Sequence, residues 1–447
     1  MIYIADDLKA FRPEIEYSIN DLIKNLGVEQ NKIDFFYADD FSTIHIEKIS
    51  INIKPARKIF SQSYKKVESL PSGVNEIKFG NETIPVLYST NKPKIEVTKN
   101  IFVTNVDFVE TFFFFLTRYE EQVITKRDKL DRFPDDESLI IKYGLNLTPV
   151  LDVYSKVIRD WLKESMSLED KMGYFLLTHD IDRLNTRVSL RHGIKKMIIN
   201  HDTEPIKFYF KDRKDGISYG LSDILKYESE FKVNSVFFFM VKKGNLFVPN
   251  SDYSIKDKKI RQKINEIKDS DSIIGLHPSL KTLKNKKLLE TEKSILESII
   301  GRKIEWSRKH YLRYSINFTF KDLEESGFKY DSSIGYINHV GYKSGTSHPF
   351  LIFDMLERKS IDLIEIPLII MDQALIRSSL GKVEKADQIL NKLINNTINY
   401  GGILTILWHN HMVMNNSINK ELDRYYLKIL NTLQSNKIEN YLRVNNN

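Results

Sequence analysis

Four short apolar runs, each leading into histidine, aspartate or arginine, constrain the fold of this chain more than any other feature. The runs are residues 174–177, 272–276, 303–306 and 403–408, and they lead into Thr178-His179-Asp180-Ile181-Asp182, His277, Arg308-Lys309-His310 and His409. Short runs rich in β-branched or aromatic residues are typical of buried strands. Side chains at the carboxyl ends of parallel strands converge on one crevice or barrel mouth. We therefore expect carboxylates, imidazoles and guanidinium groups to meet in one site that can hold a metal ion and move protons.

The length and the order of predicted elements indicate two domains. A chain of 447 residues exceeds one average domain. Residues 1–165 indicate a smaller mixed α/β domain of unknown role, and residues 170–447 alternate strand, loop and helix. Strands are expected at 174–178, 235–241, 272–276, 303–306, 330–334, 362–366 and 403–408, and helices at 221–231, 256–267, 282–299, 321–326 and 383–398. This rhythm predicts an α/β protein whose second domain is a barrel of about seven parallel strands.

The first domain has a less regular pattern. Its apolar spacing predicts strands at 1–5, 33–37 and 44–53 and helices at 14–26, 106–119 and 150–162. Residues 128–137 are expected to form a charged loop, in which Pro134 interrupts any helix.

Composition limits the chemistry and the partners. The chain has no cysteine, so a metal site must use nitrogen and oxygen ligands. The longest apolar patch, residues 111–117, is far too short to span a membrane, and the start of the chain has no evident secretory signal, so we expect a soluble cytoplasmic protein. The net charge is +7, with lysine clusters at 256–268 and 281–287. These clusters indicate solvated helix faces, with a basic rim for an acidic saccharide as the alternative, and no nucleic-acid-binding motif accompanies them.

The residues after the apolar runs allow a functional and a structural interpretation. Asp180 and Asp182 point the same way in extended backbone, so one can bind a cation while the other acts as a base; alternatively, the pair caps the next helix or binds Arg183. His277 and His409 are candidate ligands or proton donors, but each can equally be a buried structural histidine. The joint occurrence of all these residues favours the functional interpretation.

His310 lies between Arg308 and Arg313 in the sequence. A cationic imidazole next to two guanidinium groups would be unfavourable, so we expect this histidine to be neutral. A neutral imidazole is the form that binds a metal ion.

Six short sequence strings, in their order along the chain, resemble motifs of the polysaccharide deacetylases of carbohydrate esterase family 4. The motifs are Thr-His-Asp-x-Asp at 178–182, Gly-Leu-His-Pro-Ser at 275–279, Arg-x-His-Tyr-Leu-Arg at 308–313, Gly-Tyr-x-x-Gly-Thr at 341–346, Glu-Ile-Pro-Leu at 365–368 and Leu-Trp-His-Asn at 407–410. They cover residues 173–412, and Leu-Thr-Arg-Tyr-Glu-Glu at 116–121 resembles a bacterial branch with an uncharacterised N-terminal domain. The resemblance implies an irregular parallel (β/α) barrel (NodB-like) and metal-dependent removal of acetyl groups from saccharides.

The resemblance also implies roles for four catalytic residues. Asp180 would be the general base that deprotonates the attacking water, and Arg308 would orient its carboxylate. His409 would be the general acid for the leaving amine or alkoxide. Tyr311 occupies the position of a family tyrosine whose backbone amide stabilises the oxyanion.

The implied metal site departs from the family pattern at one ligand. Asp182 and His277 match family ligands, but Lys281 stands where the family has a second histidine. A lysine is protonated at neutral pH and cannot replace that histidine. Because a catalytic site usually has three protein ligands, His310 is the predicted third ligand and His179 the alternative. The expected metal is a divalent ion, with Zn²⁺ favoured.

The predicted function is therefore a metal-dependent hydrolase that removes N- or O-acetyl groups from a saccharide. Without an evident signal sequence, a saccharide precursor or nucleotide-linked sugar is the favoured substrate. Two alternatives remain: a metal-free barrel that binds a saccharide or a partner in polysaccharide synthesis, and a metal-dependent hydrolase of another amide or a phosphate ester. The N-terminal domain is expected to dock on the barrel or to cover its site.

Overall fold

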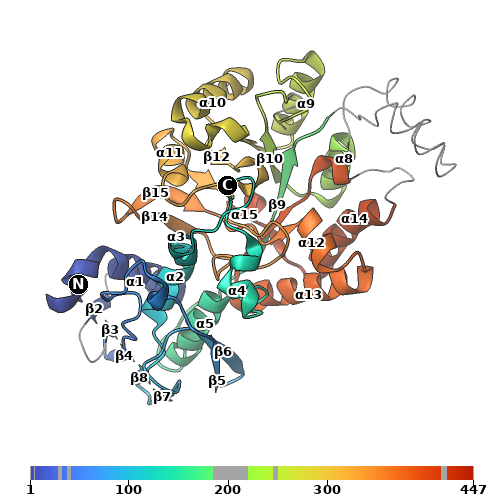
Figure 1. Cartoon of the computed structure of the whole chain (residues 1–447). Coiled ribbons are helices and arrows are strands. Elements are labelled where there is room, and N and C mark those ends of the chain that lie inside the picture. The colour runs from blue at the N-terminus through green and yellow to red at the C-terminus, as the bar shows by residue number, and fades with distance from the viewer. Residues whose placement is uncertain are drawn as a thin grey trace.

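The computed structural model describes residues 2–4, 6–28, 33–37, 42–184, 220–244, 250–413 and 420–445. They form a mixed α/β structure with two large sheets, one in the N-terminal region and one in the C-terminal region, and a third sheet of two strands (Figure 1). In these residues, no helix has the length and apolar character needed to cross a membrane.

The N-terminal region contains a six-stranded sheet of order β1-β2-β3-β4-β8-β7 and a separate β5-β6 hairpin. Its strands are β1 (Ile2–Ile4), β2 (Ile33–Tyr37), β3 (Ser42–Ile46), β4 (Ile49–Ile53), β5 (Asn75–Phe79), β6 (Glu82–Val86), β7 (Ile95–Val97) and β8 (Ile101–Thr104). Its helices are α1 (Arg12–Leu26), α2 (Phe108–Leu116), α3 (Tyr119–Val123), α4 (Leu139–Lys142) and α5 (Val150–Leu162).

Two predicted N-terminal elements are divided in the structure. The single strand predicted at 44–53 is wrong, because the chain reverses at Glu47 and Lys48 and forms the β3-β4 hairpin. Glu47 adopts φ 53°, a left-handed conformation without a glycine to signal it. The helix predicted at 106–119 ends at Leu116, and Arg118, with φ 52°, separates α2 from α3.

The C-terminal region is organised around one long curled sheet of mostly parallel strands. The main path runs β14-β15-β13-β12-β11-β10-β9-β17-β16, and β18 pairs with β9. The strands are β9 (Gly173–Ile181), β10 (Ser235–Phe239), β11 (Ile273–Leu276), β12 (Trp306–Ser307), β13 (Tyr330–Asp331), β14 (Phe350–Asp354), β15 (Lys359–Glu365), β16 (Ile370–Met371), β17 (Gly402–Leu407) and β18 (Glu439–Asn440).

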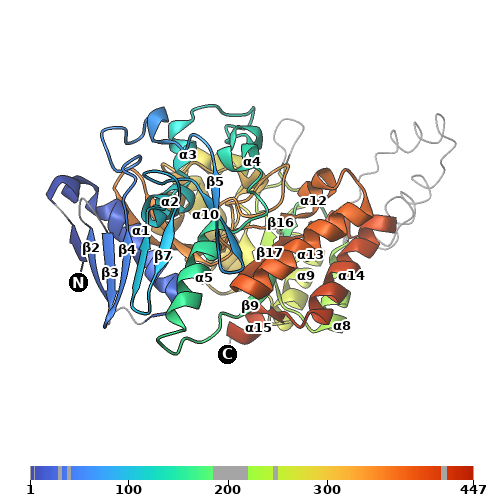
Figure 2. The same cartoon turned by 90° about the horizontal axis from the view of Figure 1, so that it is seen from below.

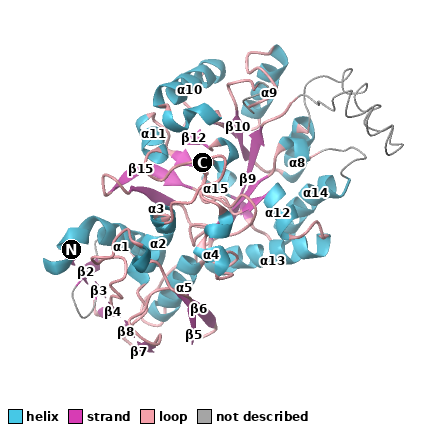
Figure 3. Cartoon of the chain, viewed as in Figure 1, coloured by secondary structure: helices cyan, strands magenta, loops and turns pink. Residues whose placement is uncertain are grey.

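Helices surround this sheet, as expected for parallel strands that are buried on both faces. They are α8 (Leu221–Phe231), α9 (Lys258–Asp269), α10 (Lys286–Ile300), α11 (Thr319–Glu325), α12 (Asp372–Ser378), α13 (Val383–Tyr400), α14 (Lys420–Ser435) and α15 (Tyr441–Asn445). Figure 3 shows the strands inside and the helices outside. All five residues of β10 are buried. The seven expected strands correspond to β9, β10, β11, β12, β13, β15 and β17, but the described sheet is a curled half-barrel with additional strands, not a closed ring of seven.

The N-terminal region packs against the edge of this sheet at the antiparallel strand β14 (Figure 1). Figure 2 shows the N-terminal helices and strands gathered on one side of the molecule. The Tyr17 hydroxyl on α1 donates to the Leu351 carbonyl at 2.7 Å, and Lys24 Nζ donates to the Pro349 carbonyl at 3.0 Å. A buried aromatic contact lies beside these bonds, because the rings of Phe113 and Phe353 are 5.6 Å apart. Side chains from the first region therefore occupy carbonyl groups that no neighbouring strand pairs.

Candidate active site

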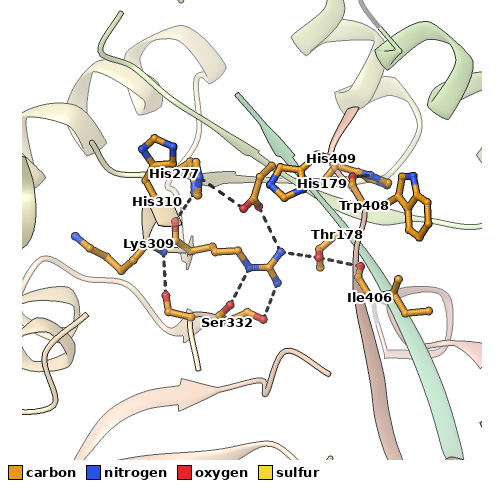
Figure 4. A network of polar contacts seen from close by, with 12 residues as sticks. Thr178, His179, His277, Lys309, His310, Ser332, Ile406, Trp408 and His409 are labelled. Carbon is orange, nitrogen blue, oxygen red and sulfur yellow. Dashed lines mark hydrogen bonds and ion pairs between the residues drawn. The ribbon is translucent and has the colours of Figure 1, made fainter. Parts of the chain in front are cut away.

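The carboxyl ends of adjacent strands bring the predicted site residues together. Strands β12, β11, β10, β9 and β17 are consecutive and parallel, so their last residues lie at the same edge of the sheet. Asp180 and Asp182 come from the end of β9, His277 follows β11, and His409 follows β17 by two residues. Arg308 and His310 follow β12, and His310 begins the short 3₁₀ helix η6 (His310–Leu312). Figure 4 shows His277, His310 and His409 gathered around this point.

Three of these side chains direct donor atoms at one another. Asp182 Oδ1 lies 3.5 Å from His277 Nε2 and 3.8 Å from His310 Nε2. The donor atoms of the three residues all lie within 4.8 Å of one another. Asp182 Oδ1 is buried and forms no hydrogen bond in the described residues. Ligands at zinc distances in a tetrahedron are about 3.3 Å apart, so the three atoms fit a divalent ion with little adjustment.

A hydrogen bond at His277 and burial at His310 suit this purpose, while His310 Nδ1 is buried without a hydrogen-bond partner in the described residues. His277 Nδ1 contacts the Arg308 carbonyl at 2.6 Å, which places the N–H on Nδ1 and leaves a lone pair on Nε2 toward Asp182. Burial, together with the nearby His277 and His409 rings, holds the pKa of His310 well below its usual value. His310 is therefore neutral, as predicted, but for a different reason: its neighbours in space are other imidazoles and an apolar interior.

Asp180 lies beside this cluster and next to a buried guanidinium group. Its Oδ2 is 3.6 Å from His277 Nε2, and its Oδ1 accepts from Arg308 Nη1 at 3.4 Å. Arg308 is fully buried and is fixed by bonds to Thr178 Oγ1 (2.6 Å), the Ser332 carbonyl (2.8 Å) and Ser332 Oγ (2.7 Å). The guanidinium group also stacks over the Phe238 ring at 4.7 Å. These contacts hold Arg308 where it can orient the Asp180 carboxylate.

His409 faces the cluster from the opposite side and has its own carboxylate partner. Its Nε2 lies 3.9 Å from Asp182 Oδ2, while its Nδ1 lies 3.0 Å from both carboxylate oxygens of Asp372. Asp372 also accepts from the His409 backbone N–H at 2.6 Å. Burial alone would lower the pKa of His409, but the adjacent Asp372 outweighs burial and raises this pKa to about 9. The imidazole is therefore protonated at neutral pH.

Asp372 was not among the predicted site residues. It directly follows the short strand β16, and the apolar stretch 366–371 leads into it in the same way as the other runs lead into their polar residues. The strand-end rule would have identified it if it had been applied to this stretch, which Pro367 made less strand-like.

Two residues that the sequence analysis considered for the third ligand position, His179 and Lys281, lie away from the cluster. His179 uses both ring nitrogens elsewhere, with Nδ1 2.7 Å from the Trp408 carbonyl and Nε2 2.8 Å from Glu228 Oε1. Both ring nitrogens of His179 are therefore engaged, and His179 is not part of the group formed by Asp182, His277 and His310. Lys281 is exposed on the 3₁₀ helix η5 (Leu280–Lys284).

Tyr311 lies at the rim of the site. Its side chain is 42% exposed, and its ring stacks on His310 with 4.1 Å between centroids. Its backbone is left-handed, with φ 60°.

The described geometry therefore places every predicted site residue, Tyr311 included, at the same edge of the sheet.

Comparison with known proteins gives one family match and several structural neighbours. The model of a family of unknown function (DUF7033) matches residues 3–167. No curated protein matches the chain. A protein from Mycobacterium smegmatis assigned as a polysaccharide deacetylase has 16% identity and a TM-score of 0.36, over 62% of this chain and 95% of that chain.

A second neighbour is Puue allantoinase, with 14% identity and a TM-score of 0.38 over 60% of this chain and 86% of that chain. A third is a CE4 family pseudoenzyme from Bacillus anthracis, with 11% identity and a TM-score of 0.32 over 62% of this chain and 66% of that chain. At TM-scores below 0.4, these structural likenesses carry no argument about function. The N-terminal region thus matches a domain family without an assigned role, and the structural neighbours include polysaccharide deacetylases and CE4 family members, the family that the motifs resemble.

Proposed function

We propose that this protein is a metal-dependent hydrolase that removes acetyl groups from a saccharide. The observation that carries the proposal is the group of Asp182, His277 and His310, whose donor atoms lie within 4.8 Å of one another. One of these atoms, Asp182 Oδ1, is buried and has no hydrogen bond in the described residues. One carboxylate and two imidazoles are a ligand set typical of catalytic zinc. The chemistry that such an ion supplies is polarisation of a carbonyl oxygen and a lowered pKa of water.

The arrangement of the residues around the cluster supports this proposal. Asp180, held by Arg308, would accept a proton from the attacking water. The new C–O bond forms at the acetyl carbon, and the bond from this carbon to the sugar nitrogen or oxygen breaks. His409, protonated because of Asp372, would then deliver its Nε2 proton to the departing atom. The products are acetate and the free amine or alcohol.

The saccharide substrate is supported by the order of six motifs and by the position of Tyr311 at the rim. A half-exposed tyrosine ring next to the catalytic groups offers an apolar face of the kind on which a sugar ring can stack. A nucleotide-linked sugar stays a prediction.

A metal-free binding barrel is the second candidate, and Lys281 is the observation that favours it. Its amine is exposed on η5 and cannot replace the missing family ligand. His310 weighs against this candidate, because it provides a third donor atom from a different strand end.

Metal analysis and an activity panel together test these functions. Protein purified without chelator is expected to contain close to one equivalent of zinc or another divalent ion and to release acetate from N- or O-acetylated sugars. Asp180→Asn is expected to lose turnover while retaining the metal. The matched control is Asp387→Asn, because Asp387 is a carboxylate on α13 that pairs with Lys428 on α14, away from the candidate site.

Each other outcome has a defined meaning. A chain that contains no metal and gains no thermal stability on addition of zinc would support the binding barrel. Turnover of cyclic amides or phosphate esters, without acetate release from sugars, would replace the deacetylase assignment. Full activity of Asp180→Asn would refute the assignment of the base.

A further inference from the structure

The segment that carries His310 is anchored mainly from outside its own region. Arg132, in the loop between α3 and α4, donates from Nη1 to the Tyr311 carbonyl at 3.0 Å. Arg313 Nε donates to the Leu130 carbonyl in the same loop. The Tyr314 hydroxyl donates to Glu121 Oε1 on α3 at 3.0 Å. Three of the four residues that follow His310 therefore bond to the N-terminal region.

The backbone of this segment has a conformation that needs such support. Tyr311 and Leu312 have φ of 60° and 51°, so two consecutive residues with side chains are left-handed. This region is unfavourable for residues other than glycine and persists only where surrounding contacts impose it. The local bonds are modest: the Leu312 N–H donates to the Lys309 carbonyl at 2.9 Å and the Arg313 N–H donates to the His310 carbonyl at 3.2 Å.

Arg132 is well suited to impose this conformation because it is itself fixed. Asp128 Oδ2 accepts from Arg132 Nε at 2.9 Å and from Nη2 at 2.7 Å. Asp128 Oδ1 accepts from the backbone N–H groups of Leu130 at 2.8 Å and of Arg132 at 3.0 Å. The carboxylate thus closes the loop on itself and leaves Nη1 of the guanidinium free to bind the Tyr311 carbonyl.

We propose that Arg132 is a positioning residue: through the Tyr311 carbonyl, it holds the left-handed turn that directs His310 toward Asp182 and His277. This assigns the N-terminal region a role in assembling the candidate active site, and it rests on the proposed function for the identity of His310 as a ligand. The stacking of Tyr311 on His310 at 4.1 Å links the anchored carbonyl to the imidazole. Loss of the anchor would let the turn relax and would widen the distances between the three donor atoms.

Hydrogen–deuterium exchange on full-length, metal-free protein tests the positioning directly. In Arg132→Met, the amides of Leu312 and Arg313 are expected to exchange at least about tenfold faster, because a charge-assisted hydrogen bond to the turn is lost. Lys129→Met is the matched control, since Lys129 is an exposed cation in the same loop with no described contact to the barrel. Amides of β17 provide the internal reference. Unchanged exchange at Leu312 and Arg313 in Arg132→Met would overturn the proposal.

A metal titration separates this proposal from the proposed function. If wild-type protein binds zinc, Arg132→Met is expected to bind it about 10- to 100-fold more weakly, while Lys129→Met matches the wild type. Equal zinc affinity in Arg132→Met would also overturn the role of Arg132. If the wild type binds no metal but Arg132→Met still loosens the turn, the anchor stands and the hydrolase proposal fails. Should Arg132→Met fail to fold, Asp128→Asn loosens the guanidinium without removing it and is expected to give the same local change to a smaller extent.

Discussion

The pair of Asp372 and His409 allows the sharpest test of the catalytic assignment. Asp372→Asn preserves the shape of the side chain but removes the charge that raises the pKa of His409 to about 9. The carboxylates of Asp182 and Asp180 still oppose burial, but without its nearest carboxylate the pKa of His409 is expected to fall toward the ordinary value of about 6.5. At pH 8, roughly nine-tenths of the wild-type imidazole is protonated, against about 3% at a pKa of 6.5.

If His409 is the general acid, this difference predicts a loss of about 30-fold in kcat/KM at pH 8, which is recovered as the pH is lowered toward 6. Acetate release across pH 5.5–10 measures the alkaline limb, and the NMR titration of His409 measures its pKa without substrate. Asp387→Asn is the control for a remote carboxylate. An alkaline limb at the same pH in wild type and Asp372→Asn would refute the role of His409.

The same pair predicts how stability depends on pH. Because the pKa of His409 is raised in the folded protein above its unfolded value of 6.5, its contribution is complete below pH 6.5 and is lost as the pH rises through about 9. That contribution is about 3 kcal/mol. Thermal midpoints measured between pH 6 and 10 are expected to fall over this window in the wild type and to change much less in Asp372→Asn; parallel curves would contradict the reasoning.

Three further predictions concern the metal site and its support. Zinc at 100 times its Kd is expected to raise the free energy of unfolding by about 2.7 kcal/mol, and thermal melts should show this gain lost in His310→Ala and kept in Lys281→Ala. Arg308→Met is expected to lower the free energy of unfolding by about 3–5 kcal/mol in urea titrations, because it leaves the buried Asp180 carboxylate without its cation; a loss below 1 kcal/mol would count against that pairing. His179→Gln is expected to leave zinc affinity unchanged while lowering the unfolding free energy by about 1–3 kcal/mol, and weaker zinc binding in this variant would return His179 to the site.

The sequence predicted that these polar residues gather at one edge of the sheet, because one local rule applies to several strands. Asp180, His277 and His409 each follow a short apolar run, and adjacent parallel strands place those positions at one edge. The rule needs only strand identity and direction, which local apolar patterns indicate well. It missed Asp372 because β16 has only two residues and its apolar stretch contains a proline.

Other features could not be predicted because they depend on contacts between distant residues. The neutral state of His310 comes from burial and from His277 and His409, not from the arginines beside it in sequence. The bond from Arg132 to Tyr311 joins residues 179 positions apart, and no local pattern signals it. The curled, open sheet likewise reflects the whole set of strand pairings, whereas counting strands suggested a barrel of about seven.

The edge strand β14 has a consequence for how the two regions depend on each other. A sheet edge with free carbonyl groups is a template on which another extended chain can add. Here the Tyr17 hydroxyl and the Lys24 amine occupy two of those groups, and Phe113 covers the ring of Phe353. The N-terminal region therefore covers part of this edge. A fragment that begins at β9 would expose the edge strand β14 and is expected to self-associate.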